Sequence, residues 1–374
     1  MFETGNQMKE EFGVENVCDF SLGNPDLEPP SSFTRTLKDK IYRGAPNMHG
    51  YMPNAGYPEV RSKIAAYIEK EQGIRISGRN VVMTCGAGGA LNVALKTILN
   101  PGDMVMTSAP GFMEYFFYAD NNSAVLDMIR SKDDFDLDVE KMERRITKYT
   151  AALIINSPNN PSGKVYPEST LRALGEMLDK KSREIGRTIY LISDEPYRKI
   201  VYNGIQVPSI FSCYRNSIVI TSFSKDLSIP GERIGYMAIH PEADAVDDFL
   251  NGAVLCNRIL GFVNAPALMQ RTVCDILDET VNVDVYKKRR DMLCAALAEI
   301  GYSFTEPEGT FYLFPKAPGG DDLKTVEMLQ EERILTVPGR GFGVKGYFRI
   351  AFCVDEEVIQ RSFDGFKRAF QKLS

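Results

Sequence analysis

The sequence predicts an α/β protein whose large domain is a mostly parallel seven-stranded sheet sandwiched by helices, joined to a smaller α+β domain. Between about residues 80 and 240, short apolar runs alternate with stretches in which apolar residues recur at helical spacing. The apolar runs are nearly continuous, as expected of parallel strands that are buried on both faces. The chain has 374 residues, of which 44% are hydrophobic, so it is long enough for a large core and for two or three domains.

The N-terminal part of the chain leads into this sheet. A strand is predicted at 17–22, followed by ordered loops at 23–30 and 46–57 that are rich in proline, glycine and asparagine. Apolar residues along one face predict a helix at 58–72. The seven strands of the sheet are expected at 81–84, 104–107, 124–129, 152–155, 189–192, 217–221 and 234–239. Helical patterns separate these strands at 90–99, 138–149 and 168–181.

Beyond residue 240 the alternation ends, and the pattern is helical as far as about residue 301. The remaining predicted elements are strands at 310–314 and 347–352 and helices at 324–332 and 355–372. We therefore expect a large domain of residues 46–284 and a discontinuous small domain of residues 1–45 and 285–374.

Composition and charge exclude several classes of protein. The net charge is −6 and no long basic run occurs, which argues against nucleic acid and anionic membrane surfaces as partners. No apolar run approaches the ~18 residues that span a bilayer, and the N-terminal residues are too acidic and polar for a signal peptide. The seven cysteines form no CxxC pair and only two histidines occur, so we expect no metal site and a reducing, cytoplasmic location.

A glycine-rich turn, Thr84–Leu91, lies between the first strand of the sheet and the helix that follows. Such a turn presents free backbone N–H groups at a helix N-terminus, where a phosphate binds. A dinucleotide fingerprint is the main alternative, but Leu91 replaces its third glycine and no acidic residue lies near position 106. The turn therefore favours a single phosphate over NAD, although by itself it is equally typical of a plain turn.

Two further strands are each followed by a residue that is a candidate for binding a ligand. Phe112 follows the strand at 104–107, where it either stacks on a flat ring or caps the core. The crowded turn Asn156–Gly163 follows the strand at 152–155 and contains two prolines. A turn this rigid aims the Asn160 amide as a hydrogen-bond donor, unless it is an ordinary surface turn.

Three ionisable residues follow the last parallel strands. Asp194 ends a buried strand, so its carboxylate needs a cationic partner, either a protonated ring nitrogen or an arginine in the sheet. Tyr197 is three positions further on, within reach of the same ligand. Lys225 lies at the mouth of the next strand, where desolvation and nearby cations lower the pKa of an amine and favour Schiff-base formation. When a lysine at the end of a strand is considered without its neighbours, it is more commonly a solvated residue in a turn.

These residues are expected to lie close together, because the carboxyl ends of parallel strands meet at one edge of a sheet. The edge is expected to carry a phosphate nest, a stacking aromatic ring, an amide donor, a buried carboxylate, a phenol and a lysine. Those are the contacts that a pyridoxal 5′-phosphate ring requires. The combination is far more specific than any of its members.

The chain resembles, nearly end to end, the class I/II pyridoxal-phosphate-dependent aminotransferases of the aspartate aminotransferase superfamily, which have fold type I. The stretch Ser222–Tyr236 matches the lysine signature of that family without a gap. The resemblance implies that Lys225 is the Schiff-base lysine and that Asp194 and Tyr197 act with it in catalysis. It also implies a set of cofactor-binding residues, namely Tyr51, Ala87, Gly88, Phe112, Asn160, Asp194, Tyr197, Ser222, Lys225 and Arg233.

The resemblance further implies the role of each residue in that set. The phosphate is held by Ser222, Arg233 and the backbone N–H groups of Ala87 and Gly88. The ring is contacted by Phe112 through stacking, by Asp194 at its nitrogen, and by Tyr197 and Asn160 at its 3′-oxygen. Tyr51 matches a tyrosine that reaches the phosphate of the partner subunit, which implies a homodimer with shared active sites.

The resemblance also implies how the substrate is bound. Arg349 matches the arginine that clamps the substrate α-carboxylate, and Gly23 and Asn160 are expected near the same group. Position 112 is Phe where several relatives have Trp or Tyr, which preserves stacking. The arginine that recognises a dicarboxylate side chain has no assignable counterpart, since Arg43 and Arg258 are only weak candidates. Aspartate as the substrate is therefore in doubt.

The activity implied is an aminotransferase that moves an amino group between an L-amino acid and a 2-oxo acid in ping-pong fashion, with Lys225 as general base and acid. The nearest alternative keeps fold and cofactor but performs β-elimination at a C–S bond, or decarboxylation. A ligand-sensing regulator built on such a domain carries an N-terminal DNA-binding domain. Only 50 residues precede Tyr51, without a basic helix-turn-helix pattern, so we do not favour a regulator.

Overall fold

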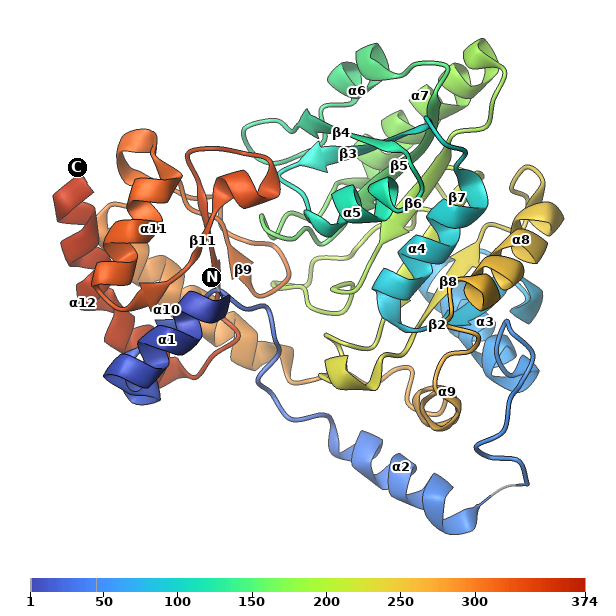
Figure 1. Ribbon diagram of the computed structural model, residues 1–374, viewed down its shortest axis with the longest axis horizontal. Helices are drawn as coiled ribbons and strands as arrows, with labels where there is room; N and C mark the ends of the chain where they lie inside the picture. The colour runs from blue at the N-terminus through green and yellow to red at the C-terminus, as the bar shows by residue number, and fades with distance from the viewer. Residues whose placement is uncertain (1, 45, 374) are drawn as a thin grey trace.

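The centre of the larger part of the protein is a seven-stranded sheet in the order β2-β8-β7-β6-β5-β3-β4 (Figure 1). The computed structural model describes residues 2–44 and 46–373. The strands are β2 (Val81–Thr84), β3 (Met104–Ala109), β4 (Val125–Arg130), β5 (Thr150–Asn156), β6 (Tyr190–Asp194), β7 (Ser217–Ser222) and β8 (Gly235–Ile239). Only β8 runs antiparallel to its neighbours in this sheet. The prediction of a mostly parallel seven-stranded sheet is confirmed.

Helices cover both faces of this sheet, as the buried apolar runs require. One face packs against α4 (Gly86–Ile98), α5 (Glu114–Asp120) and α8 (Val246–Ile259). The other face packs against α3 (Pro58–Gln72), α6 (Val139–Arg145), α7 (Glu168–Ile185) and α9 (Ala267–Val273). The alternation along β5 shows the division, because Ile154 faces the first group and Leu153 the second. All seven residues of β5 are buried.

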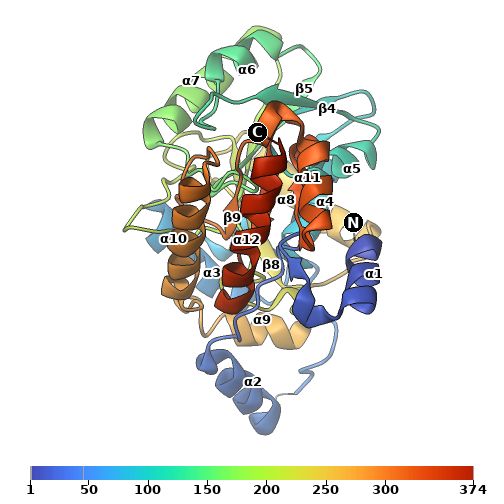
Figure 2. The ribbon, with the colours of Figure 1, turned by 90° about the vertical axis from the view of Figure 1, so that its left-hand side faces the viewer.

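A smaller α+β part lies beside the sheet (Figures 1 and 2). Its strands are β9 (Tyr312–Leu313), β11 (Val337–Pro338) and β12 (Phe348–Ala351), which form an antiparallel sheet, and β1 (Cys18–Asp19) paired with β10 (Ile334–Leu335). Its helices are α1 (Phe2–Phe12), α10 (Val283–Ile300), α11 (Asp322–Glu331) and α12 (Glu356–Leu373). Figure 2 shows α12 between α10 and α11, and Ile359, Phe366 and Ala369 bury its inner face.

The core of this smaller part joins both ends of the chain, since Phe20 packs in the same cluster as Phe348 and Phe366. The helix α2 (Ser31–Arg43) lies apart from it and packs against α9, with Phe33 in the core of the larger part. Residues 31–43 therefore pack on the larger part, although the predicted domain boundary at residue 46 places them in the smaller one. The division into 46–284 and 1–45 with 285–374 stays a prediction, and residue 45 lies outside the described residues.

The structure adds three helices that apolar spacing did not predict, namely α1, α2 and α5. In α5 the run Tyr115-Phe116-Phe117 gives no helical periodicity, because both its buried and its exposed positions are aromatic. The predicted strands at 17–22 and 310–314 shorten to two paired residues each, because their remaining residues form loops. None of the helices in the described part of the chain is long and apolar enough to cross a bilayer.

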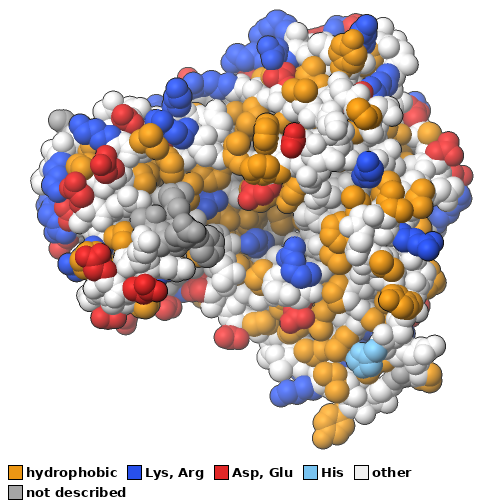
Figure 3. All heavy atoms as spheres, viewed as in Figure 1, with side chains coloured by type: hydrophobic (Ala, Val, Ile, Leu, Met, Phe, Trp, Pro, Cys, Tyr) orange, Lys and Arg blue, Asp and Glu red, His pale blue; other side chains and the backbone are white. Residues whose placement is uncertain are grey.

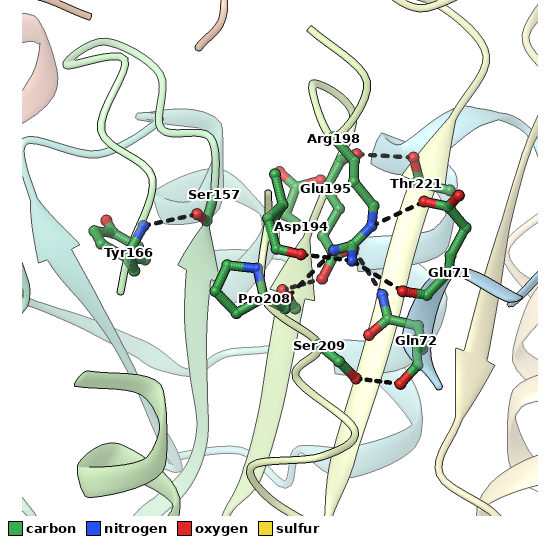
Figure 4. Close-up of polar contacts among 12 residues, drawn as sticks. Glu71, Gln72, Ser157, Tyr166, Asp194, Glu195, Arg198, Pro208, Ser209 and Thr221 are labelled. Carbon is green, nitrogen blue, oxygen red and sulfur yellow. Dashed lines mark hydrogen bonds and ion pairs between the residues drawn. The ribbon is translucent and has the colours of Figure 1, made fainter. Parts of the chain in front are cut away.

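A buried polar network ties the carboxyl end of β6 to the end of α3 (Figure 4). Glu195 is 2% exposed and accepts hydrogen bonds from Arg198 Nη1 at 2.9 Å, Ser193 Oγ at 2.7 Å and Gln72 Nε2 at 3.2 Å. The Arg198 guanidinium also donates to the carbonyl of Val207 at 2.8 Å. A carboxylate this deeply buried is tolerated because its charge and its lone pairs are satisfied.

Arg198→Met tests the contribution of this network to stability. The substitution leaves the Glu195 carboxylate buried without its cation, so we expect the free energy of unfolding to fall by about 3–5 kcal/mol. Urea unfolding followed by circular dichroism measures the difference. The control is Arg144→Met, whose partner Glu140 lies 3.9 Å away on the exposed face of α6, and which should cost less than about 1 kcal/mol. Equal losses in the two variants would contradict the prediction.

Candidate active site

A cleft of about 510 Å³ opens where the carboxyl ends of the parallel strands face the smaller part of the protein. Figure 3 shows this hollow, with basic side chains at its floor and hydrophobic side chains around it. Eleven of the twelve residues predicted for the site line the cleft, namely Gly23, Ala87, Gly88, Phe112, Asn160, Asp194, Tyr197, Ser222, Lys225, Arg233 and Arg349. The twelfth, Tyr51, does not.

Lys225 lies in the turn after β7 and points its amine across the cleft. Its Nζ donates to the carbonyl of Gly23 at 2.7 Å. Burial lowers the pKa of Lys225 to about 8, and the positive charges of Arg349 and Arg233 act in the same direction, while Cys353 opposes them. Gly23 cannot be replaced by a larger residue, because a Cβ atom there would lie 1.8 Å from the hydroxyl of Tyr312.

Asp194 is the last residue of β6 and is 5% exposed. Burial raises the pKa of its carboxyl to about 7, while a hydrogen bond from the Tyr115 hydroxyl to Oδ2, 2.6 Å long, opposes this rise. Its other oxygen, Oδ1, is buried and has no hydrogen-bond partner among the described residues. No arginine within the described ranges pairs with it, so the alternative of an ion pair in the sheet is not observed. A cationic group in the cleft is the partner that this oxygen lacks.

The turn after β5 is held against the end of β6. Asn156 donates from Nδ2 to the Asp194 carbonyl at 2.8 Å and accepts at Oδ1 from the Asn160 backbone N–H at 2.7 Å. The Asn160 side-chain oxygen accepts from Arg349 Nη1 at 3.1 Å. With its oxygen engaged, the Asn160 amide nitrogen is the group left to donate into the cleft.

One end of the cleft has the composition of an anion site. The helix α4 begins at Gly86, which has a φ of +71°, and Ala87 and Gly88 follow in its first turn. The Arg233 guanidinium lies opposite, close enough that a Cβ atom on Gly86 would approach its Nη2 to 2.9 Å. The Ser222 hydroxyl at the end of β7 lines the same space. A helix N-terminus, a hydroxyl and a guanidinium together suit a phosphate.

Arg349 on β12 occupies the wall contributed by the smaller part. Its Nη2 donates to the Ser21 carbonyl at 2.7 Å, and its guanidinium lies 4.5 Å from the Tyr312 ring and 4.9 Å from the Phe342 ring. Only two of its N–H donors are engaged in the bonds named here, and Nε is buried without a partner among the described residues. A fixed guanidinium with spare donors suits a carboxylate.

Phe112 and Tyr197 complete the cleft around Asp194. The Phe112 ring meets the Tyr115 ring edge-on, with centroids 5.6 Å apart. The Tyr197 hydroxyl lies 3.0 Å from that of Tyr312 and is buried. Burial raises the pKa of both tyrosines, that of Tyr312 to about 12, so both phenols are protonated, and either hydroxyl can donate in the bond between them.

Sequence reasoning missed three residues that hold this site together, namely Tyr115, Asn156 and Tyr312. Asn156 opens the turn from which only Asn160 was selected, and Tyr115 lies three residues after Phe112, which alone was selected beyond the strand at 104–107. Tyr312 gave a strand signal and nothing more, because its contacts with Arg349 and Tyr197 come from distant parts of the chain.

Tyr51 lies outside the cleft and is 93% exposed. It lines a shallow surface depression together with His49, Met52 and Phe262. Arg43 and Arg258 are also exposed and do not line the cleft, and Arg43 pairs with Asp39 on the surface of α2. Within one subunit, the described residues therefore place neither arginine at the site.

Comparison with known proteins gives consistent matches. The family model for aminotransferase class I and II matches residues 15–365. A probable aspartate aminotransferase from Methanocaldococcus jannaschii is 30% identical, covering 96% of this chain and 94% of that protein. A probable aspartate/prephenate aminotransferase from Aquifex aeolicus is 31% identical, covering 96% and 92%. The structure of an amino transferase from Eubacterium rectale has a TM-score of 0.97 and 38% identity, covering 100% of this chain and 94% of that one.

The buried carboxyl of Asp194 predicts a pH dependence of stability in the cofactor-free protein. The rise in its pKa from 3.8 to about 7 means that the folded state holds the proton more tightly than the unfolded state. The resulting cost is absent below about pH 4 and complete above about pH 7, where it reaches about 4 kcal/mol at ~1.4 kcal/mol per pKa unit. Asp194→Asn, which never ionises, should therefore gain stability relative to the parent as pH rises.

Urea unfolding at several pH values between 4 and 8 measures this difference. The exposed Asp133→Asn serves as the control and should show no comparable trend. A difference between Asp194→Asn and the parent that stays constant across this range would show that Asp194 is ionised in the folded state at every pH tested.

Proposed function

This chain belongs to the class I and II aminotransferases, and on that premise we propose that its cleft binds pyridoxal phosphate and an L-amino acid side by side. The enzyme depends on pyridoxal phosphate and moves an amino group between an amino acid and a 2-oxo acid. The observation that supports the placement is the convergence in one cleft of Lys225, the partnerless oxygen of Asp194 and the spare donors of Arg349.

The residues of the cleft fit this cofactor at each of its polar groups. The phosphate would lie against the first turn of α4, the Ser222 hydroxyl and the Arg233 guanidinium. The protonated ring nitrogen would pair with Asp194, whose Oδ1 is otherwise without a donor. Tyr197 and Asn160 would donate to the 3′-oxygen, and Phe112 would stack on the ring.

When bound, pyridoxal phosphate supplies an aldehyde that condenses with amines and a ring that withdraws electrons from the substrate Cα. We assign the covalent attachment of the cofactor to Lys225. Burial lowers the pKa of this amine to about 8, so its free form is accessible near neutral pH. Once released by the incoming substrate, the Lys225 amine takes the proton from Cα as a general base. Asp194 keeps the proton on the ring nitrogen.

Substrate orientation comes from the smaller part of the protein. Arg349 holds the α-carboxylate through a bidentate pair, and its guanidinium is fixed by Tyr312, by Asn160 and by the Ser21 carbonyl. Tyr312 is a positioning residue in this scheme, because its ring supports Arg349 while its hydroxyl bonds to Tyr197. Gly23 leaves room for the Tyr312 hydroxyl and brings its own carbonyl to Lys225.

We also propose that the enzyme is a homodimer in which Tyr51 completes the site of the partner subunit. Tyr51 is too exposed for a residue that serves its own subunit, and other exposed apolar residues accompany it, namely Ile41, Tyr42, Leu255 and Ile259. Figure 3 shows hydrophobic side chains over the lower part of the molecule, where Figure 1 places α2 and α9. A second copy of the chain would cover them.

The seven cysteines are free thiols, and five of them are buried. Unpaired thiols of this kind are typical of proteins in a reducing compartment. We therefore propose the cytoplasm as the location of the enzyme, in keeping with the scattered cysteine spacing of the sequence.

The alternative reactions on this fold are C–S β-elimination and decarboxylation. They are separated from transamination by the fate of the nitrogen. A β-lyase releases pyruvate and ammonia from cystathionine without any acceptor, whereas an aminotransferase forms one amino acid for each one consumed and releases no ammonia. The comparisons favour transamination, since the relatives are named aminotransferases.

Lys225→Ala tests the proposed chemistry. Loss of the amine removes both the covalent attachment and the general base, so we expect turnover to fall by roughly 10³-fold or more while the fold is retained. Product amino acid formed from a 2-oxo acid acceptor measures turnover, and absorbance measures the attached cofactor. Lys96→Ala, an exposed lysine on α4, is the matched control and should behave as the parent. Turnover in Lys225→Ala close to that of the parent would transfer this role to another residue.

Mixing two variants tests whether Tyr51 acts across the dimer. Tyr51→Phe removes one hydrogen bond to a charged phosphate, so we expect cofactor affinity to fall by roughly 10- to 100-fold. At a cofactor concentration between the two dissociation constants, Lys225→Ala is inactive and most sites of Tyr51→Phe are empty. A mixed dimer has one site with an intact Lys225 and, from the other chain, an intact Tyr51. Equal mixing should therefore restore roughly a quarter of the sites.

If Tyr51 served its own subunit, no site in the mixture would be intact and activity would stay at the level of the separate variants. Tyr42→Phe is the control, because Tyr42 is as exposed as Tyr51 and its variant should bind the cofactor as the parent does. Sedimentation checks that all the variants have the same oligomeric state.

A further inference from the structure

The cleft contains an acidic side chain that the proposed mechanism does not use. Glu114 is the first residue of α5, is exposed, and lines the cleft beside Met113. Partial desolvation in the cleft raises the pKa of its carboxyl, and the positive charge of Arg349 acts in the opposite direction. The lining of the cleft also includes the apolar residues Leu22, Pro230, Val337 and Phe342.

The cations of the cleft are all assigned in the proposed function. Among the described residues that line it, the basic side chains are Lys225, Arg233 and Arg349. Lys225 attaches the cofactor, Arg233 holds its phosphate and Arg349 holds the α-carboxylate. None is left for a second carboxylate on the substrate, and Arg43 and Arg258 of the same subunit do not reach the cleft.

We propose that Glu114 determines substrate specificity by disfavouring amino acids with an acidic side chain and favouring those with a cationic or hydrogen-bond-donating end. This inference rests on the proposed function, because it places the α-carboxylate on Arg349. The substrate side chain then meets an apolar wall with one carboxylate, where a second negative charge is repelled and a donor is paired. The 2-oxo acid acceptor is subject to the same selection, so pyruvate is preferred over 2-oxoglutarate.

Two other roles for Glu114 make different predictions. An acidic residue at the start of a helix stabilises the helix, and this role affects folding without distinguishing one substrate from another. In the second role, the Glu114 carboxylate pairs with Arg349 in place of the substrate carboxylate. Removing it would then improve the binding of all substrates by the same factor. Only the proposed role changes the ranking of substrates by side-chain charge.

The test compares kcat/KM of the holoenzyme for L-aspartate, L-glutamate, L-methionine, L-lysine and L-ornithine, with pyruvate as the acceptor. In the parent, the basic and neutral donors should exceed the acidic ones. In Glu114→Gln the ratio of basic to acidic kcat/KM should fall by roughly tenfold or more at low ionic strength, and less at high salt. Asp120→Asn, at the other end of α5 and outside the cleft lining, loses the same charge and should leave the ratio unchanged.

Binding of unreactive ligands provides a second readout that does not depend on turnover. Calorimetry compares maleate, which has two carboxylates, with 6-(trimethylammonio)hexanoate, which has one carboxylate and a quaternary cationic end that cannot condense with an aldehyde. Glu114→Gln should tighten the binding of maleate and weaken the binding of the cationic ligand. Thermal unfolding of both variants shows whether either substitution disturbs the fold.

The outcomes distinguish a failure of the proposed aminotransferase function from a failure of the proposed role of Glu114. If the parent transaminates none of the five donors, the proposed function fails. If it transaminates some of them but Glu114→Gln changes every kcat/KM by one factor, only the role of Glu114 is overturned. A parent that prefers aspartate and glutamate over the other donors would overturn it as well.

Discussion

The burial of the Asp194 carboxyl is the constraint on which the rest of the site depends. An ionised carboxylate at the end of a fully packed strand is unfavourable without a cation, and the described residues offer only the Tyr115 hydroxyl to one of its two oxygens. The backbone of Asp194 is fixed in place, because Asn156 donates a hydrogen bond to its carbonyl. The buried ion pair of Glu195 and Arg198 also fixes the residues that follow Asp194. The fold thus leaves one oxygen of a buried carboxyl without a partner, and in the proposed complex the protonated ring nitrogen would supply it.

The parallel sheet explains why the other groups gather around Asp194. Each strand delivers its following turn to the same edge, so the start of α4 after β2, Phe112 after β3, Asn160 after β5 and Lys225 after β7 all face one cleft. The smaller part closes the opposite side with Gly23, Tyr312 and Arg349, which come from both ends of the chain. In the proposed function, the larger part holds the cofactor and the smaller part orients the substrate, and Tyr312 links the two through its contacts with Tyr197 and Arg349.

Local signals in the sequence were sufficient for the sheet and for the residues that directly follow its strands, whereas Gly23, Ser222, Arg233 and Arg349 were assigned only through the resemblance to a known family. A buried strand requires a continuous apolar run, and the polar residue after the run identifies the sheet edge, as at Asp194 and Lys225. Features that depend on distant contacts were not predictable in this way. The aromatic run in α5 gave no period, so Tyr115 was missed, and Tyr312 acquires its role only when β9 meets β12 beside Arg349. Tyr51 lies outside the cleft of its own chain, and its proposed role depends on a second copy of the chain.

The charges in the cleft also link substrate binding to proton transfer. Arg349 and Arg233 both lower the pKa of Lys225, in addition to the larger effect of burial. In the proposed complex a carboxylate neutralises Arg349 and a phosphate neutralises Arg233, so their repulsion of the lysine proton disappears while burial remains. The amine that Lys225 regains on substrate binding is consequently a stronger base than in the empty cleft. The same anions that orient the reaction therefore help the lysine to hold the proton that it removes from Cα.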